Sequence, residues 1–157
     1  MKSKGVNKII PRQLLSTNVK LKYYWENRNK NKHVSFKIDH TLFTFAELLI
    51  NDGLFSDLKP EEDFGFTFDV KDEKWLIPTN DRIMFIDLHK EGLDIMLFRD
   101  SDFTLKLIYS SPYYINRKIV YNDLKSLRKD ERHQITLLCS SKGVFLFLDG
   151  KIVGSFQ

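Results

Sequence analysis

Residues 144–156 read VFLFLDGKIVGSF, two apolar runs on either side of Asp149-Gly150. A type I′ turn needs a positive φ at both of its central residues, and Asp-Gly is one of the pairs that accept this conformation. The stretch therefore predicts a β-hairpin at the end of the sequence. Such a hairpin makes the last two strands antiparallel neighbours in one sheet.

Short apolar runs at a spacing of roughly ten residues precede this hairpin. Phe64, Phe66 and Phe68 alternate with polar residues, which is the period of a half-buried strand. Connections of about four polar residues permit only antiparallel neighbours, since a parallel crossover needs a dozen or more residues. The other runs predicted as strands are 83–88, 93–98, 103–109, 113–115 and 133–139.

The fold class predicted from these runs is all-β, an antiparallel β-sandwich or a barrel. Thirteen Phe residues suit two sheets packed face to face around a core about 10 Å thick. Residues 122–129 interrupt the strand pattern and predict a short helical turn. Residues 42–50 fit both a helix and a strand, and the Phe-Thr-Phe sequence at 43–45 favours the strand.

The first 33 residues differ from the rest in charge. They hold nine Lys and Arg against one acid, Glu26, a net charge of +8; residues 34–157 hold sixteen bases and twenty acids, a net charge of −4. We therefore divide the chain into a basic N-terminal extension, 1–33, and a sandwich domain, 34–157. Within the extension, residues 19–25 predict one strand and residues 27–32 a solvated loop.

A single cysteine, Cys139, excludes an internal disulfide, and its place in an apolar run predicts a buried strand residue rather than a reactive thiol.

Residues 1–8 begin like a signal peptide, but Pro11 breaks the apolar stretch that would have to follow. No run approaches the roughly 18 apolar residues of a membrane span. We expect a cytoplasmic protein, or an extracellular one if the sequence is part of a longer secreted chain.

Residues 64–157 resemble the laminin-G-like, or concanavalin A-like, β-sandwich superfamily. Residues 132–137, RHQITL, precede the hairpin at 144–154 as a W-H-x-V-x strand precedes a V-x-L-Y-V-D-G-x-x-V-G hairpin in that superfamily. Arg132 stands here in place of the Trp, and Phe147 in place of the Tyr. The runs at 64–70, 83–88 and 92–98 are similar to the middle strands of the same fold, so the resemblance covers residues 64–157.

This resemblance implies a jelly-roll sandwich that binds glycans or proteins through loop side chains or a sheet face. It also implies a further strand after the hairpin, paired with the N-terminal one. Because the sequence ends at Gln157, we expect residues 1–50 to supply that strand, unless the sequence is part of a longer chain.

Catalytic and metal sites have little support in the sequence. Glycosidases need two carboxyl groups roughly 5–9 Å apart, and the nearest candidates, Asp69 with residues 72–73 and Asp100 with Asp102, fall at predicted turns. Turn carboxylates are expected there for local hydrogen bonds. We therefore expect no enzyme and no resident cofactor. Ca²⁺ held by Asp100 and Asp102, or by residues 80–81, is the metal alternative, because it prefers loop oxygens.

Two groups of residues are candidate binding sites. Trp75, Tyr113 and Tyr114 lie on predicted connections, where aromatic side chains can contact a sugar or a protein; for Trp75 the alternative is a cap on the core. In the basic extension, cations beside an aromatic run could bind nucleic acid. These cations are Lys20, Lys22, Arg28, Lys30 and Lys32.

The function predicted from the sequence is a non-catalytic recognition module that mediates protein–protein interaction within a larger assembly. The first alternative is a lectin-like carbohydrate-binding module. The second is nucleic-acid binding through the basic N-terminal extension.

Overall fold

The computed structural model describes residues 21–28, 31–38, 59–71 and 73–157. These residues form ten β-strands and two short 3₁₀ helices, η2 (Glu73–Leu76) and η3 (Leu124–Ser126). The strands are β1 (Leu21–Arg28), β2 (Asn31–Ile38), β3 (Asp63–Val70), β4 (Ile83–Lys90), β5 (Leu93–Arg99), β6 (Leu105–Ser110), β7 (Arg117–Tyr121), β8 (His133–Ser140), β9 (Gly143–Leu148) and β10 (Lys151–Phe156). The all-β prediction is confirmed, and η3 confirms the helical turn.

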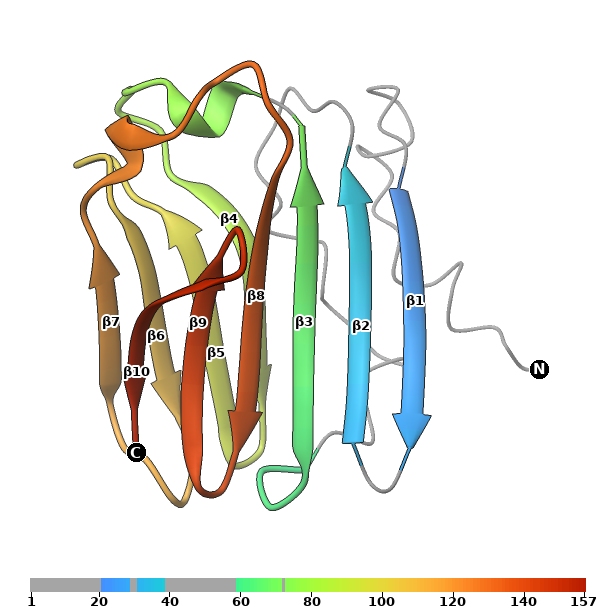
Figure 1. Cartoon of the computed structure of the whole chain (residues 1–157). Coiled ribbons are helices and arrows are strands. Elements are labelled where there is room, and N and C mark those ends of the chain that lie inside the picture. The colour runs from blue at the N-terminus through green and yellow to red at the C-terminus, as the bar shows by residue number, and fades with distance from the viewer. Residues whose placement is uncertain (1–20, 29–30, 39–58, 72) are drawn as a thin grey trace.

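The strands form two sheets that pack as a sandwich (Figure 1). Sheet A has the order β1-β2-β3-β8-β9-β10, and sheet B has the order β4-β5-β6-β7. The chain changes sheets twice, between β3 and β4 through η2 and between β7 and β8 through η3, and both helices lie at the same end of the sandwich (Figure 1). No helix in these described residues is long and apolar enough to cross a membrane.

Sheet B is the meander that the short connections predict. Strands β4, β5, β6 and β7 pair in sequence order, each antiparallel to the next. Gly92, at φ 79°, closes the turn between β4 and β5. The strand predicted at 113–115 is wrong: those residues form a turn, and the last strand of the sheet is β7. The turn is closed at Ser111 and Tyr114, where each N–H donates to the other's carbonyl, with N···O distances of 2.7 and 3.2 Å.

The N-terminal strands extend sheet A at β3. Strands β1 and β2 are antiparallel, and β2 runs parallel to β3, with residues 39–62 between them. The structure corrects two predictions. The predicted loop at 27–32 is part of the hairpin, in which Asn27 pairs with Lys32, and the predicted boundary at 33/34 falls within β2. Residues 1–20 and 42–50 lie outside the described residues. The described part of 1–50 pairs at the edge opposite β10, so it does not supply a strand beside the closing hairpin.

The predicted closing hairpin is confirmed in its turn and its pairing. Asp149 and Gly150 have φ values of 51° and 82°, as a type I′ turn requires. Strand β10 pairs antiparallel with β9, with a bulge between Ile152 and Gly154. A bulge bends the strand and increases its twist, and here it turns the end of β10 towards β7.

The core lies between the two sheets and is formed by alternate residues of their strands. Phe64, Phe66 and Phe68 of β3 belong to it, as the period of two predicts. Cys139 is 2% exposed, so the buried reading is confirmed, and burial raises the pKa of its thiol well above the ordinary range. Where β10 approaches β7, Gly154 packs so closely on Ile119 that a Cβ at this position would overlap Ile119 Cγ2.

Candidate interaction surface

Trp75 does not offer a binding face to the solvent. It lies in η2, is only 2% exposed and belongs to the core. Its ring stands edge-on to Phe85 at 5.7 Å and to His133 at 6.2 Å, measured between centroids. The prediction of Trp75 as a ligand contact is therefore corrected, and the alternative, a cap on one end of the core, is the arrangement in the structure.

Tyr114 and Tyr113 are neighbours with opposite surroundings. Tyr114 is 8% exposed, its ring packs on Phe156 at 5.1 Å, and its hydroxyl donates to the Ser141 carbonyl at 3.3 Å. Its burial removes it from the predicted contact set. Tyr113 is 50% exposed and is the one of the three predicted aromatic contacts that the structure leaves accessible.

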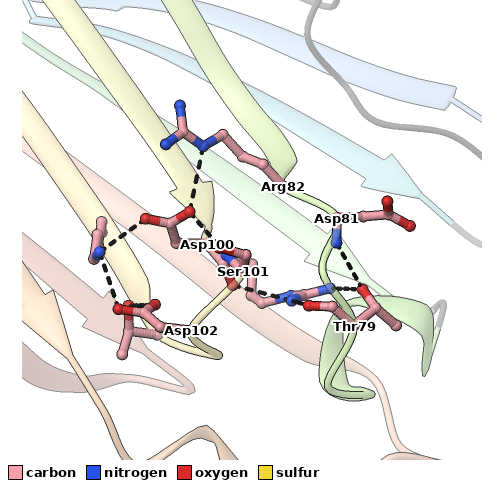
Figure 2. A network of polar contacts seen from close by, with 9 residues as sticks. Thr79, Asp81, Arg82, Asp100, Ser101 and Asp102 are labelled. Carbon is pink, nitrogen blue, oxygen red and sulfur yellow. Dashed lines mark hydrogen bonds and ion pairs between the residues drawn. The ribbon is translucent and has the colours of Figure 1, made fainter.

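The side chains of Asp100 and Asp102, predicted as Ca²⁺ ligands, are both bound by Lys106. Lys106 Nζ lies 2.8 Å from Asp100 Oδ2 and 3.1 Å from Asp102 Oδ2 (Figure 2). Arg82 Nε adds a contact of 3.4 Å to Asp100 Oδ1. The hydrogen bond from Lys106 is the main reason that the pKa of Asp100 falls to about 2. The ammonium group thus lies where Ca²⁺ was predicted, between the two carboxylates. Among the described residues, no three His, Cys, Asp or Glu side chains form a group that could hold a metal ion.

Beside these carboxylates lies a fully buried guanidinium that the sequence reasoning missed. Arg99 is 0% exposed; Nη2 donates to Thr79 Oγ1 at 3.0 Å, and Nη1 to the Asp100 carbonyl at 3.0 Å (Figure 2). Burial lowers the pKa of Arg99. Its position in the strand was a usable signal, because Arg99 continues the inward alternation of Leu93, Ile95 and Leu97. The network ties the end of β5 to the segment before β4.

A second buried polar group joins the closing hairpin to β8. His133 Nδ1 lies 2.6 Å from Asp149 Oδ2, and His133 Nε2 lies 2.6 Å from the Arg128 carbonyl oxygen. Asp149 Oδ1 also accepts the Gln134 N–H at 2.8 Å. Burial lowers the pKa of His133, but the bonds to Arg128 and Asp149 outweigh it, so the pKa is raised. This is structural chemistry within the fold.

Of the five cations predicted to bind nucleic acid, three lie on the N-terminal hairpin. Lys22 and Arg28 are in β1, and Lys32 is in β2. Lys20 and Lys30 lie outside the described residues.

The outer face of sheet B carries charged residues among apolar ones such as Ile108 and Val120. His89 Nε2 lies 2.6 Å from Asp87 Oδ1, and His89 Nδ1 lies 2.8 Å from Asp94 Oδ1. The bond to Asp94 is the largest of the effects that raise the pKa of His89. Lys106 and Lys118 lie on β6 and β7 of the same face. Charged side chains of this kind are typical of a solvent-exposed surface.

The outer face of sheet A is different where it crosses β3, β8, β9 and β10, because its two central rows carry no charged residue on these four strands. One row runs across β3, β8, β9 and β10 as Thr67, Thr136, Phe147 and Ile152, and the next as Gly65, Leu138, Phe145 and Ser155. We call these eight residues the uncharged face. Ile152 is 56% exposed and Leu138 39%, while both Phe side chains are half-buried.

Sequence reasoning missed the uncharged face, although its signal is present. The residues that alternate with the core positions of β8, β9 and β10 are apolar or hydroxyl-bearing, where an ordinary outer face alternates to charged residues. In Figure 1, where sheet A is nearer the viewer, the described elements leave β3, β8 and β9 uncovered. The fold and this surface define a two-sheet β-sandwich with an uncharged patch on one outer face. No protein-family model, no curated protein and no solved structure matches the chain.

Proposed function

We propose that this protein is a non-catalytic recognition module that binds a protein partner through the uncharged face. The observation that carries the proposal is the contrast between the two outer faces of one sandwich. Sheet B carries charged side chains on all four of its strands, among apolar residues such as Ile108 and Val120. Sheet A presents Leu138, Phe145, Phe147 and Ile152 around the hydroxyls of two threonines. Contiguous exposed apolar surface with few charges is typical of protein interaction sites.

The resemblance to laminin-G-like and concanavalin A-like sandwiches is compatible with this proposal, since it implies protein or glycan ligands at a loop rim or a sheet face. Fold analogy alone does not choose between the two. We favour a protein because the uncharged face is mainly apolar, and because two of the three aromatic residues predicted to contact a sugar or a protein, Trp75 and Tyr114, are core residues. The polar groups of the uncharged face are also few, and Thr67 Oγ1 and Thr136 Oγ1 already lie 3.2 Å apart in a mutual hydrogen bond.

The test is capture of partners from the source cells with three baits: the parent chain, Phe147→Glu and Ile108→Glu. Ile108 is the matched control, because it is an outward apolar residue of the charged face and is 36% exposed. We expect a protein that is retained by the parent chain and by Ile108→Glu and lost by Phe147→Glu. Its binding is then measured with purified components.

Two results contradict the proposal. One is a partner that the parent chain and Phe147→Glu bind equally. The other is binding on a glycan array that survives Phe147→Glu and is lost with Tyr113→Ala, which would favour the carbohydrate alternative at the loop between β6 and β7. A steep salt dependence of nucleic-acid binding that is lost when Lys22 and Lys32 are neutralised would favour the second alternative.

A further inference from the structure

The uncharged face carries large side chains on one side of β8, its raised half, and small residues on the other side, its low half. Strand β9, on one side of β8, carries Phe145 and Phe147. On the other side, β3 carries Gly65 and Thr67 in the same two rows. Phe147 therefore shares its row with Thr67, and Phe145 shares its row with Gly65. In each pair the two residues lie on opposite sides of β8.

We propose that the partner bound by the uncharged face is a second copy of this chain, related by a two-fold axis that runs along β8 within the interface. This inference rests on the proposed function, since it uses the same face. Rotation about such an axis keeps each row at its height and exchanges the sides of β8. Phe147 then packs over Thr67 of the second copy, and Phe145 over Gly65. The raised half of each copy fills the low half of the other.

The charges of the face favour this occupant. A two-fold interface brings one surface patch against itself, so a patch whose charges are all of one sign repels its own copy. The two central rows escape this cost because they hold no charge. At the end of the face, Asp69 is paired with Arg132 at 3.2 Å, and Asp149 is bound to His133.

The part of sheet A that overlaps between the two copies is larger than the uncharged face, and its size is sufficient. With the axis along β8, five strands of each copy overlap with the other copy, because β9 and β10 lie over β3 and β2 of the second copy. Five strands about 4.8 Å apart, each with seven residues rising about 3.3 Å, cover roughly 550 Å² per copy. Two copies bury roughly 1,100 Å² in total, just above the ~1,000 Å² expected of a specific interface. We therefore expect a reversible dimer whose population depends on concentration.

Light scattering after size exclusion tests the inference on the purified full chain. One chain has a mass of 18.6 kDa. The measured mass of the parent chain and of Ile108→Glu should rise towards twice this value as concentration rises. Phe147→Glu should raise the dissociation constant at least about tenfold, and circular dichroism should show that its fold is retained. A parent chain that stays monomeric at about 100 µM, a concentration well above the micromolar range of weak interfaces, overturns the inference. So does a dimer that Phe147→Glu does not weaken.

Thiol cross-linking tests the position of the axis. Leu138 lies on β8 and meets Leu138 of the second copy across the axis, so Leu138→Cys should give a covalent dimer with a short bis-maleimide. Facing sheets about 10 Å apart need such a bridge in place of a direct disulfide. Ile108→Cys is the control of similar exposure, and the native Cys139 is 2% exposed and should not react. Equal cross-linking of both variants, or of neither, contradicts the axis.

The two proposals fail in different ways. A monomeric parent chain that still captures another protein through Phe147 removes the second copy and leaves the proposed function standing. A dimer unaffected by Phe147→Glu, together with no partner lost by that variant, removes both.

Discussion

Replacement of Gly154 by Ala tests how β10 is fitted against β7. The backbone of Gly154 is not in the left-handed region, so alanine can adopt it without strain. The added methyl group would overlap Ile119 Cγ2 and would lie 3.4 Å from Ile119 Cβ. Ile119 is 6% exposed and its χ1 angle is restricted by β-branching, so it has little room to move.

The expected cost follows from two opposing effects. Overpacking of a core costs about 1–3 kcal/mol, while replacement of glycine by alanine in a strand returns about 0.5–1 kcal/mol. We expect Gly154→Ala to lower the free energy of unfolding by about 1–2 kcal/mol. Ile119→Ala should itself cost about 2–4 kcal/mol, because it removes a buried side chain.

Urea unfolding followed by far-UV circular dichroism gives the four corners of a double-mutant cycle. With Ile119 already truncated, Gly154→Ala should be neutral or stabilising, because the clashing methyl group is gone, so the coupling energy should be about 1–3 kcal/mol. Ser155→Ala, at the exposed next position, is the control and should change stability by less than about 0.5 kcal/mol. The reasoning is refuted if Gly154→Ala costs the same in both backgrounds, or if it stabilises the parent chain.

Two further predictions concern pH. The raised pKa of His133 means that its bonds stabilise the fold fully below its ordinary pKa of about 6.5 and lose this effect as the pH rises through the folded value. His133→Gln should therefore flatten the stability profile above about pH 6.5, and a slope unchanged by the substitution contradicts the assignment. The lowered pKa of Asp100 acts at the acid end: its contribution is present above about pH 4 and is lost as the pH falls towards 2. Asp100→Asn should therefore flatten the acid limb in a urea-midpoint series, and equal acid sensitivity of the two chains would exclude the Lys106 pair as its cause.

The strands and turns were largely predictable because their causes are local. Alternation at Phe64, Phe66 and Phe68 reports which face of β3 is buried, and Asp149-Gly150 supplies the two positive φ values of its turn. The strand predicted at 113–115 failed because a hydrogen-bonded turn held by Ser111 competes with the same apolar residues. Local pattern does not report which of two satisfactory conformations the rest of the chain stabilises.

The candidate site was less predictable, because an aromatic side chain on a connection can face either the solvent or the core. Trp75 and Tyr114 turn inwards since Phe85, His133 and Phe156 meet them from other strands. Asp100 and Asp102 have the ligand chemistry of a Ca²⁺ site, but Lys106, on the strand that follows them, donates hydrogen bonds to both. Each outcome depends on a neighbour that is not adjacent in the sequence.

The sequence by itself determined that this chain is all-β, that its core is built on alternate residues, and that it ends in a type I′ hairpin, because period and turn chemistry are properties of neighbouring residues. Only the tertiary structure decided that β2 runs parallel to β3, since that pairing joins strands separated by residues 39–62. It also decided that Thr67, Thr136, Phe147 and Ile152 share one row. The uncharged face exists only through strand order and register, which are fixed by burying one face of each sheet against the other.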